Sequence, residues 1–182
     1  VVISAGFKES GPEGAERENQ FLERSRACKL RVIGPNCLGL INTAAKLNAS
    51  FGPVMPAQGN IAFFSQSGAL CTAILDWSGS ERIGFSKFIS LGNKMDVDEV
   101  DVLRALAADR QTEVILGYIE GVRNGVEFIA AAREATAVKP LIVTKSGGTA
   151  AGARAASSHT GTLAGSETAF NAAFRQSGVL RA

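Results

Sequence analysis

This sequence has few histidine and cysteine residues and no large excess of charge of either sign. It has one histidine (His159) and three cysteines (Cys28, Cys37 and Cys71) without metal-ligand spacing, so no zinc site is predicted. We interpret the cysteines as the reduced thiols of a cytoplasmic protein. The net charge of +2, with scattered basic residues, gives no electrostatic footprint for nucleic acid or an anionic membrane. No apolar run approaches the roughly 20 residues of a membrane-spanning helix.

The remaining composition is typical of a folded globular protein. Hydrophobic residues make up 46% of the chain and charged residues 20%. A length of 182 residues allows one domain, or one domain with part of another. The chain begins without methionine, inside the apolar run Val1-Val2-Ile3, so we expect a fragment of a longer protein.

From residue 60 onward, apolar runs of strand length alternate with helical patterns. Strands are predicted at 61–64, 85–91, 114–119 and 141–144, and helices at 67–77, 98–109, 124–136 and 166–176. In the first of these helices, we expect one buried face made of Ala69, Leu70, Ala73, Ile74 and Trp77. In the second, we expect Val100, Leu103 and Leu106 to face inward. Strands that alternate with helices of this length form a parallel sheet with right-handed crossovers. The predicted class is therefore α/β, with a doubly wound sheet.

The first 60 residues are less regular. Short strands are predicted at 1–5 and 30–33, with a helix at 13–28 that has only a narrow apolar face. Residues 34–59 show no convincing period of either kind and contain several prolines and glycines. We predict that they form a crossing segment between two domains.

Ligands in an open parallel sheet bind beyond the carboxyl ends of the strands. The tetrapeptide Ser65-Gln66-Ser67-Gly68 is predicted there, between a strand and a helix. Its small residues would let the first free amides of the helix bind a phosphate. An N-cap role, in which the Ser67 hydroxyl satisfies those amides, explains the serine equally well.

The loop at 146–165 carries glycine, serine and threonine residues and the only histidine. Loops of this length within compact domains are usually functional or disordered. A neutral imidazole is a nucleophile toward phosphorus, so His159 is a candidate phosphoryl acceptor. Glu120, at a strand end, could orient the imidazole through a hydrogen bond, and Lys145 and Arg154 could neutralise phosphate. All four residues could equally be ordinary solvent-exposed side chains without a role in phosphoryl transfer. Composition does not decide between these interpretations.

A hydrolase is a further hypothesis, because Ser67, Glu120 and His159 follow the serine–acid–histidine order of the α/β-hydrolases. The G-x-S-x-G elbow is absent, since Ser65 and Ala69 stand where glycines are required. The hydrolase hypothesis is therefore disfavoured.

The segment Ser157-Ser158-His159-Thr160-Gly161-Thr162-Leu163-Ala164-Gly165, preceded by Lys145-Ser146-Gly147-Gly148, resembles the phosphohistidine loop of ADP-forming acetyl-CoA synthetases. These enzymes are relatives of succinyl-CoA synthetase. Residues 34–39 (Gly-Pro-Asn-Cys-Leu-Gly), 65–69 (Ser-Gln-Ser-Gly-Ala) and 90–93 (Ser-Leu-Gly-Asn) resemble further motifs of this family. The resemblance covers essentially the whole chain, in the family's order.

The resemblance implies an α/β fold with a flavodoxin-like doubly wound parallel sheet, preceded by the end of a Rossmann-like CoA-binding domain. Residues 1–55 would be the C-terminal remnant of that domain plus a linker. Residues 56–182 would be the phosphohistidine domain of the alpha-type part of an NDP-forming acyl-CoA synthetase.

The reaction implied by the resemblance is the reversible conversion of acyl-CoA, phosphate and ADP to carboxylic acid, CoA and ATP. It passes through an acyl phosphate and a phosphohistidine on a mobile loop. His159 would be the nucleophile and Glu120 its orienting partner, with Asn36 and Cys37 near the thioester. The implied phosphate site comprises Ser65, Gln66, Ser67, Gly68, Thr160 and Gly161.

The implied partners are an ATP-grasp domain or subunit that holds ADP or ATP with Mg²⁺, and further copies in an oligomeric parent enzyme. Coenzyme A would be a substrate. Neither the ATP-grasp part nor the glycine-rich phosphate turn of the CoA-binding domain is found in this sequence. We therefore expect the chain alone to be inactive and to bind no cofactor.

One alternative from another functional class stays open. Some protein lysine acetyltransferases carry a similar module as an acyl-CoA-sensing regulatory part, and that module lacks the loop histidine. The presence of His159 argues against this alternative. An ATP-grasp segment in the parent reading frame would favour the ligase, and a transferase domain would favour the sensor. A purely structural role would leave the long loop of small residues without a purpose.

Overall fold

A computed structural model describes residues 1–147 and 167–182. Its strands form a seven-stranded sheet in the order β2-β1-β4-β3-β5-β6-β7. These strands are β1 (Gly39–Asn42), β2 (Leu47–Ser50), β3 (Gln58–Ser65), β4 (Phe85–Ser90), β5 (Val114–Ile119), β6 (Leu141–Lys145) and β7 (Leu180–Arg181). The helices are a short 3₁₀ helix η1 (Lys8–Ser10), α1 (Pro12–Ala27), α2 (Gly68–Glu81), α3 (Glu99–Ala108), α4 (Gly125–Thr136) and α6 (Glu167–Ser177).

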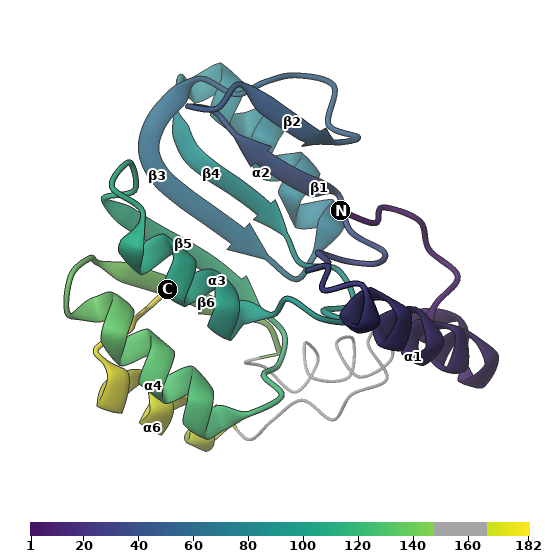
Figure 1. Cartoon of the computed structure of the whole chain (residues 1–182). Helices are drawn as coiled ribbons and strands as arrows, with labels where there is room; N and C mark the ends of the chain where they lie inside the picture. Colours follow the sequence, from purple (N-terminus) through teal and green to yellow (C-terminus); the bar gives the residue numbers. More distant parts are fainter. Residues whose placement is uncertain (148–166) are drawn as a thin grey trace.

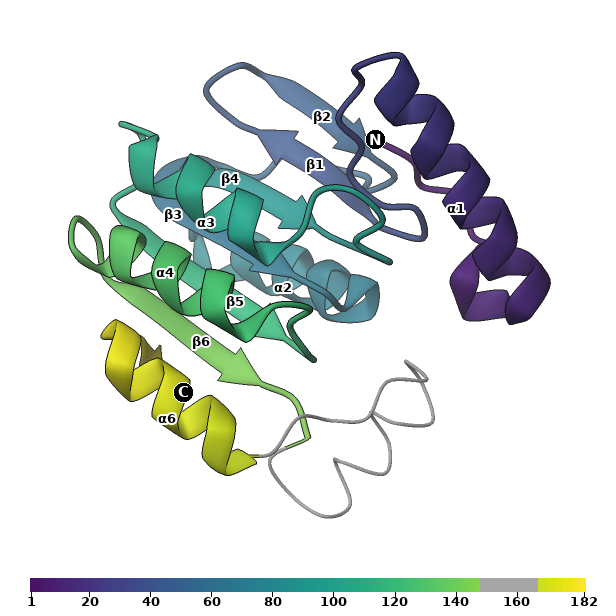
Figure 2. The same ribbon diagram turned by 60° about the horizontal axis from the view of Figure 1, so that its bottom comes forward.

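Strands β3 to β7 are parallel to one another, whereas β1 and β2 form an antiparallel hairpin that joins the sheet beside β4. Among the parallel strands, the first in sequence lies between the second and the third, which is the flavodoxin order. Helix α2 covers one face of the sheet, and α3, α4 and α6 lie on the other (Figures 1 and 2). The predicted flavodoxin-like α/β class is confirmed.

Two hydrophobic clusters, one on each face of the sheet, stabilise this arrangement. Successive residues of a strand point to opposite faces, so Phe64 packs into the cluster under α3, α4 and α6, while Phe63 packs into the cluster under α2. Phe64 and Phe128 are almost wholly buried. Burial of each such ring contributes about 1.5–3 kcal/mol to the free energy of folding.

The buried face was predicted correctly for α3 and only in part for α2. Val100, Leu103 and Leu106 of α3 are buried as predicted. In α2 the buried residues are Cys71, Leu75 and Ser78, whereas the Trp77 side chain is 54% exposed. Leu70 and Ile74 also pack against this cluster, as predicted. Ala69 and Ala73 are exposed, so the buried side of α2 is centred on Cys71 and Leu75 and turns Trp77 toward solvent.

The N-terminal third also differs from the prediction. Residues 1–5 and 30–33 are joined by a hydrogen bond from the Val2 N–H to the Ile33 carbonyl (2.9 Å), but neither segment forms a strand. Residues 34–59, predicted without regular structure, contain the β1–β2 hairpin. This hairpin extends the sheet of the C-terminal part. The division of the chain at residues 55 and 56 stays a prediction.

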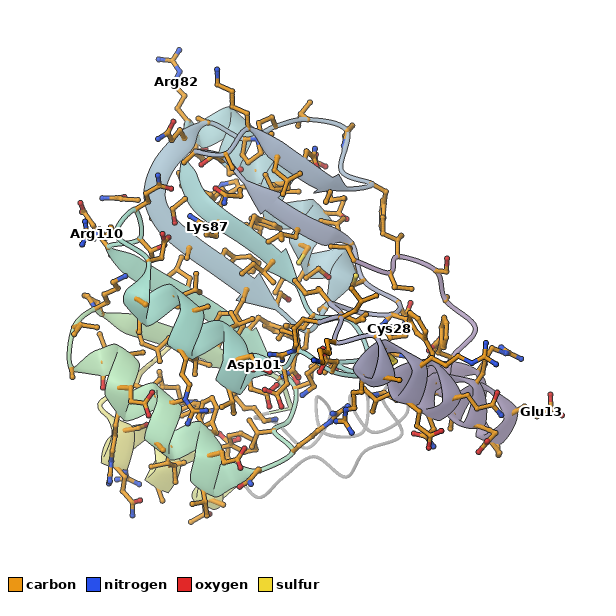
Figure 3. All side chains as sticks on the ribbon, viewed as in Figure 1. Glu13, Cys28, Arg82, Lys87, Asp101 and Arg110 are labelled. Atoms are coloured by element: carbon orange, nitrogen blue, oxygen red, sulfur yellow. The ribbon has the colours of Figure 1, made fainter. Side chains whose placement is uncertain are left out.

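Helix α1 lies beyond the carboxyl ends of β3 and β4, the ends marked by their arrowheads (Figure 2). Figure 3 shows its residue Glu13 at the periphery of the molecule. None of the helices within 1–147 and 167–182 has the length and hydropathy needed to cross a membrane.

Candidate active site

A cleft of about 1030 Å³ lies at the carboxyl ends of the central parallel strands. The chain leaves β3 for α2 on one face of the sheet and leaves β4 for α3 on the other, so the end of β3 is the topological switch point at which ligands bind in such folds. Six residues predicted from the sequence as site residues line this cleft: Asn36, Cys37, Gln66, Ser67, Gly68 and Glu120.

The turn from β3 into α2 is held by Ser65, which is fully buried. Its hydroxyl accepts a hydrogen bond from the Ser67 N–H and donates one to the Ser67 carbonyl, both at 3.0 Å. Ser65 is not among the residues that line the cleft. Its predicted contact with phosphate stays a prediction, and the contacts described here give it a role in shaping the turn.

Ser67 is the N-cap of α2, as the sequence suggested. Its side chain accepts a hydrogen bond from the Leu70 N–H (3.3 Å). The N–H groups of Gly68 and Ala69 precede the first intrahelical bond and lie at the positive end of the helix dipole. A Cβ atom placed on Gly68 would meet nothing within 4 Å, so an anion can approach these amides closely.

Glu120 follows β5 directly and is partly exposed on the wall of the cleft. Its N–H donates to the Gln66 Oε1 (2.8 Å). The neighbouring Ile119 pairs with Lys145 at the end of β6, and the Ile119 carbonyl accepts a hydrogen bond from the Ser146 N–H (2.9 Å). The chain therefore leaves β6 beside Glu120 on its way to His159. His159, Thr160, Gly161 and Arg154 lie outside the described residues.

Lys145 does not line the cleft, although a contact with phosphate was considered from the sequence. It is 5% exposed, and its Nζ lies 4.8 Å from the centroid of the Phe170 ring. Its amine donates to the Ser146 carbonyl. Burial lowers the pKa of Lys145, and Glu167 partly opposes that shift.

Asn36 and Cys37 form part of the opposite wall of the cleft. The Asn36 Nδ2 donates to the Asn93 Oδ1 (3.3 Å). The buried Cys37 thiol donates to the Val2 carbonyl (3.3 Å), and burial raises its pKa. A thiol that stays protonated is a poor nucleophile, so Cys37 is better placed to shape the wall than to attack a substrate.

The cleft is also lined by Lys94 and by three charged residues that sequence reasoning missed: Lys8, Glu9 and Arg123. Burial lowers the pKa of Lys8, and the nearby Glu18 carboxylate partly opposes that effect. Lys8 and Glu9 come from the segment that folds over the strand ends before α1. The sequence shows only a polar turn there, and no local pattern indicates that it reaches the end of β4.

The described residues contain no group of three or more histidine, cysteine, aspartate or glutamate side chains that could hold a metal ion. The cleft offers free helix amides, the carboxylates of Glu9 and Glu120, and several cations around an open volume. Such a set of groups suits the binding and transfer of an anionic phosphoryl group.

Residues 58–182 match the family model described as the succinyl-CoA ligase like flavodoxin domain. The chain belongs to this family. Over 182 residues it is 53% identical to an ADP-forming acetate–CoA ligase I of Archaeoglobus fulgidus, with 100% of this chain and 27% of that protein covered. It is 49% identical to the alpha subunit of an ADP-forming acetate–CoA ligase I of Pyrococcus furiosus, covering 100% of this chain and 39% of the subunit.

Structural comparison gives the same result. A structure of the dinucleotide-forming acetyl-coenzyme A synthetase 1 of Ca. Korarchaeum cryptofilum, in complex with phosphate and ADP, superposes with a TM-score of 0.94 and 46% identity. The match covers 100% of this chain and 39% of the synthetase chain. The predicted resemblance to the NDP-forming acyl-CoA synthetase family is confirmed. This chain spans less than two fifths of the length of each of these ligase relatives.

Proposed function

We propose that the full-length protein is an ADP-forming acyl-CoA synthetase and that this chain supplies its phosphoryl-transfer domain. The reaction interconverts acyl-CoA, ADP and phosphate with carboxylic acid, CoA and ATP. One observation carries the proposal: the free amides of α2 and the Glu120 side chain line the same cleft, at the switch point of the sheet. The acetate–CoA ligase relatives support it, and acetyl-CoA is therefore the first substrate to test.

In the proposed first step, a phosphate oxygen attacks the thioester carbonyl of acyl-CoA, the C–S bond breaks and CoA leaves as its thiolate. The product is an acyl phosphate. The Gly68 and Ala69 amides bind the phosphate, since the start of a helix stabilises negative charge. Ser67 contributes by fixing the first turn of α2. That the Korarchaeum synthetase was captured with phosphate supports an anion site in this family.

In the second step, one imidazole nitrogen of His159 attacks the phosphorus of the acyl phosphate and the carboxylate leaves. Glu120 accepts a hydrogen bond from the other ring nitrogen, which orients the imidazole and stabilises its developing positive charge. The phosphoryl group then passes from His159 to ADP, and ATP is formed. Thr160 and Gly161 complete the phosphoryl-binding residues of this step.

ADP and Mg²⁺ belong to an ATP-grasp domain or subunit in this proposal. The fraction of each relative that this chain leaves uncovered gives room for such a part. We further propose that CoA is a substrate bound next to Asn36 and Cys37, that the parent enzyme is oligomeric and that it acts in the cytoplasm. This chain by itself should lack turnover, because no nucleotide site is assigned to it.

The acyl-CoA-sensing module of a lysine acetyltransferase is the less favoured function. The relatives described above are named as ligases or a synthetase, which supports the ligase instead.

The test is steady-state ATP formation by the full-length protein supplied with acetyl-CoA, ADP, Mg²⁺ and phosphate. We expect turnover in the native protein and none in His159→Ala. The matched control is Ser158→Ala, which removes a neighbouring polar side chain and should keep most of the activity. Equal turnover in the native protein and His159→Ala would contradict the proposed function.

A further inference from the structure

The loop after β5, which carries Glu120, is held by side chains from two other elements. The Gln66 side chain approaches it from the β3–α2 turn, and the Lys94 side chain approaches it from the loop after β4. Both side chains contact the backbone of Gly121, the residue that follows Glu120. The position of the proposed catalytic carboxylate therefore depends on residues outside its own strand and loop.

All the hydrogen-bonding capacity of the Gln66 carboxamide is used within the protein. Its Oε1 accepts from the Glu120 N–H (2.8 Å) and the Gly121 N–H (3.1 Å). Its Nε2 donates to the Gly121 carbonyl (2.9 Å) and the Glu99 Oε2 (3.2 Å). A carboxamide has two donor hydrogens and two acceptor lone pairs. Nothing remains of this side chain to bind a phosphate.

Lys94 completes a closed ring with Gln66, Glu99 and Gly121. Its Nζ donates to the Glu99 Oε2 (3.0 Å) and to the Gly121 carbonyl (2.8 Å). The Gln66 Nε2 bonds the same two acceptors. Two donors thus share two acceptors, and the loop after β5 is tied to the first turn of α3.

Glu99 fixes the orientation of the carboxamide. Its side chain is buried and ion-paired with Lys94, and an ionised carboxylate can only accept hydrogen bonds. The Gln66 Nε2 must therefore face Glu99, which leaves the Oε1 facing the Glu120 and Gly121 amides. A flipped carboxamide would place its NH₂ group against those two N–H donors.

We propose that Gln66 is a positioning residue that holds Glu120 in place for His159, and that Gln66 is not a ligand of phosphate. Lys94 and Glu99 act with it on the same loop. This inference rests on the proposed function of Glu120. It replaces the phosphate-binding role predicted for the Gln66 side chain from the sequence.

The test is a double-mutant cycle in the full-length protein, with Gln66→Met, Glu120→Gln and the double variant. The rate of His159 phosphorylation is measured in single turnovers with acetyl-CoA and labelled phosphate. We expect each single variant to lower the rate. In Gln66→Met the loss should be about 100-fold if the Glu120 side chain moves by about 1 Å. Because the two residues act as a unit, the double variant should be no slower than the slower single variant. The KM for phosphate should stay within about twofold of the native value, as expected where only a transition-state interaction is lost.

The possible outcomes separate this inference from the proposed function. If Glu120→Gln is slow but the two effects multiply, or if Gln66→Met raises mainly the KM for phosphate, Gln66 is not a positioning residue. If Glu120→Gln leaves the rate unchanged, the proposed role of Glu120 fails first and the inference fails with it.

Lys94→Met is a second variant that should show the same coupling to Glu120, should Gln66→Met fold poorly. Gln111→Met is the matched control. Gln111 is exposed and bonds Lys87 away from the cleft, so its loss should leave the rate unchanged. The melting temperature of each variant shows whether a lower rate comes from the lost hydrogen bonds or from unfolding of the protein.

Discussion

The Nδ2 of Asn93 lies 2.8 Å from the Oε2 of Glu18, and this hydrogen bond joins the loop after β4 to helix α1. Both residues are buried. The same Nδ2 contacts the Glu9 Oε2 (2.5 Å), and the Asn93 Oδ1 accepts from Asn36. One carboxamide therefore connects three segments of the N-terminal third to the end of β4, beside the cleft.

Replacement of Asn93 by alanine should remove the shortest hydrogen bond to the buried Glu18 carboxylate and leave it with the Lys8 N–H (3.3 Å) and the Lys8 ammonium (3.6 Å). We expect the free energy of unfolding to fall by about 1.5–3 kcal/mol, because a hydrogen bond to a charged group contributes about that much. Urea denaturation measures this loss. Asn60→Ala is the control, since Asn60 is exposed and its side chain bonds the exposed Glu113. Equal losses in the two variants would contradict the structural role of Asn93.

Gly92 should not tolerate a side chain. Its φ angle is +57°, and a Cβ atom there would lie 2.2 Å from the Pro35 carbonyl oxygen. Gly92→Ala should therefore destabilise the protein by more than about 1 kcal/mol and displace Asn93 and Lys94. Gly79→Ala is the matched control in α2, where a Cβ meets nothing within 4 Å. It should stabilise the protein by about 0.5–1 kcal/mol. Thermal unfolding of both variants checks the opposite signs.

Loss of the Ser67 cap should affect both stability and phosphate binding. Ser67→Ala removes the acceptor of the Leu70 N–H, which costs about 0.5–2 kcal/mol in the free energy of unfolding. The KM for phosphate should rise, because the first turn of α2 is less well fixed. Ser80→Ala removes a hydroxyl from the exposed end of the same helix and should change neither quantity. An unchanged KM for phosphate in Ser67→Ala would argue against an anion site at α2.

Asp109 should contribute to stability at neutral pH and lose that contribution in acid. Burial favours a higher pKa, but hydrogen bonds from Thr112 and Lys87 outweigh it and hold the pKa of Asp109 below its ordinary value. A carboxylate with a lowered folded-state pKa stabilises the fold above its unfolded pKa of about 3.9. That stabilisation is lost as the pH falls through the folded-state pKa.

Asp109→Asn should therefore be less stable than the native protein at pH 7, and the difference should shrink as the pH falls below about 4. Urea denaturation at a series of pH values measures it. Arg110, the next residue, lies near the start of β5 (Figure 3). The cleft is at the carboxyl ends of the strands, so activity there should be little affected. A stability difference that does not change with pH would contradict the account of Asp109.

Much of the fold was predictable because the C-terminal part has clear local periods. The pattern Val100, Leu103 and Leu106 places one apolar face on α3, and Asp98 forms its capping box. The hairpin of β1 and β2 was missed because each strand has only four residues and β2 has no buried position. Its turn, at residues 43–46, lacks the Asn-Gly or Asp-Gly pair that indicates a hairpin.

The candidate site was predictable where motifs mark strand ends. Ser67, Gly68 and Glu120 follow strands directly, and the flavodoxin order brings their segments together. Glu99 and Lys8 were not predictable in the same way. An acid at the start of a helix usually favours the helix dipole, and only the folded chain shows Glu99 buried against Gln66 and Lys94.

In the proposed reaction, His159 carries the phosphoryl group between acyl phosphate and ADP. The most direct measurement is the transfer of labelled phosphate to the full-length protein in the presence of acetyl-CoA, without ADP. We expect a label that is labile in acid and stable in base, present in the native protein and absent from His159→Ala. Label of the same amount and stability in His159→Ala, or no label in a native protein that includes an intact ATP-grasp part, would contradict it.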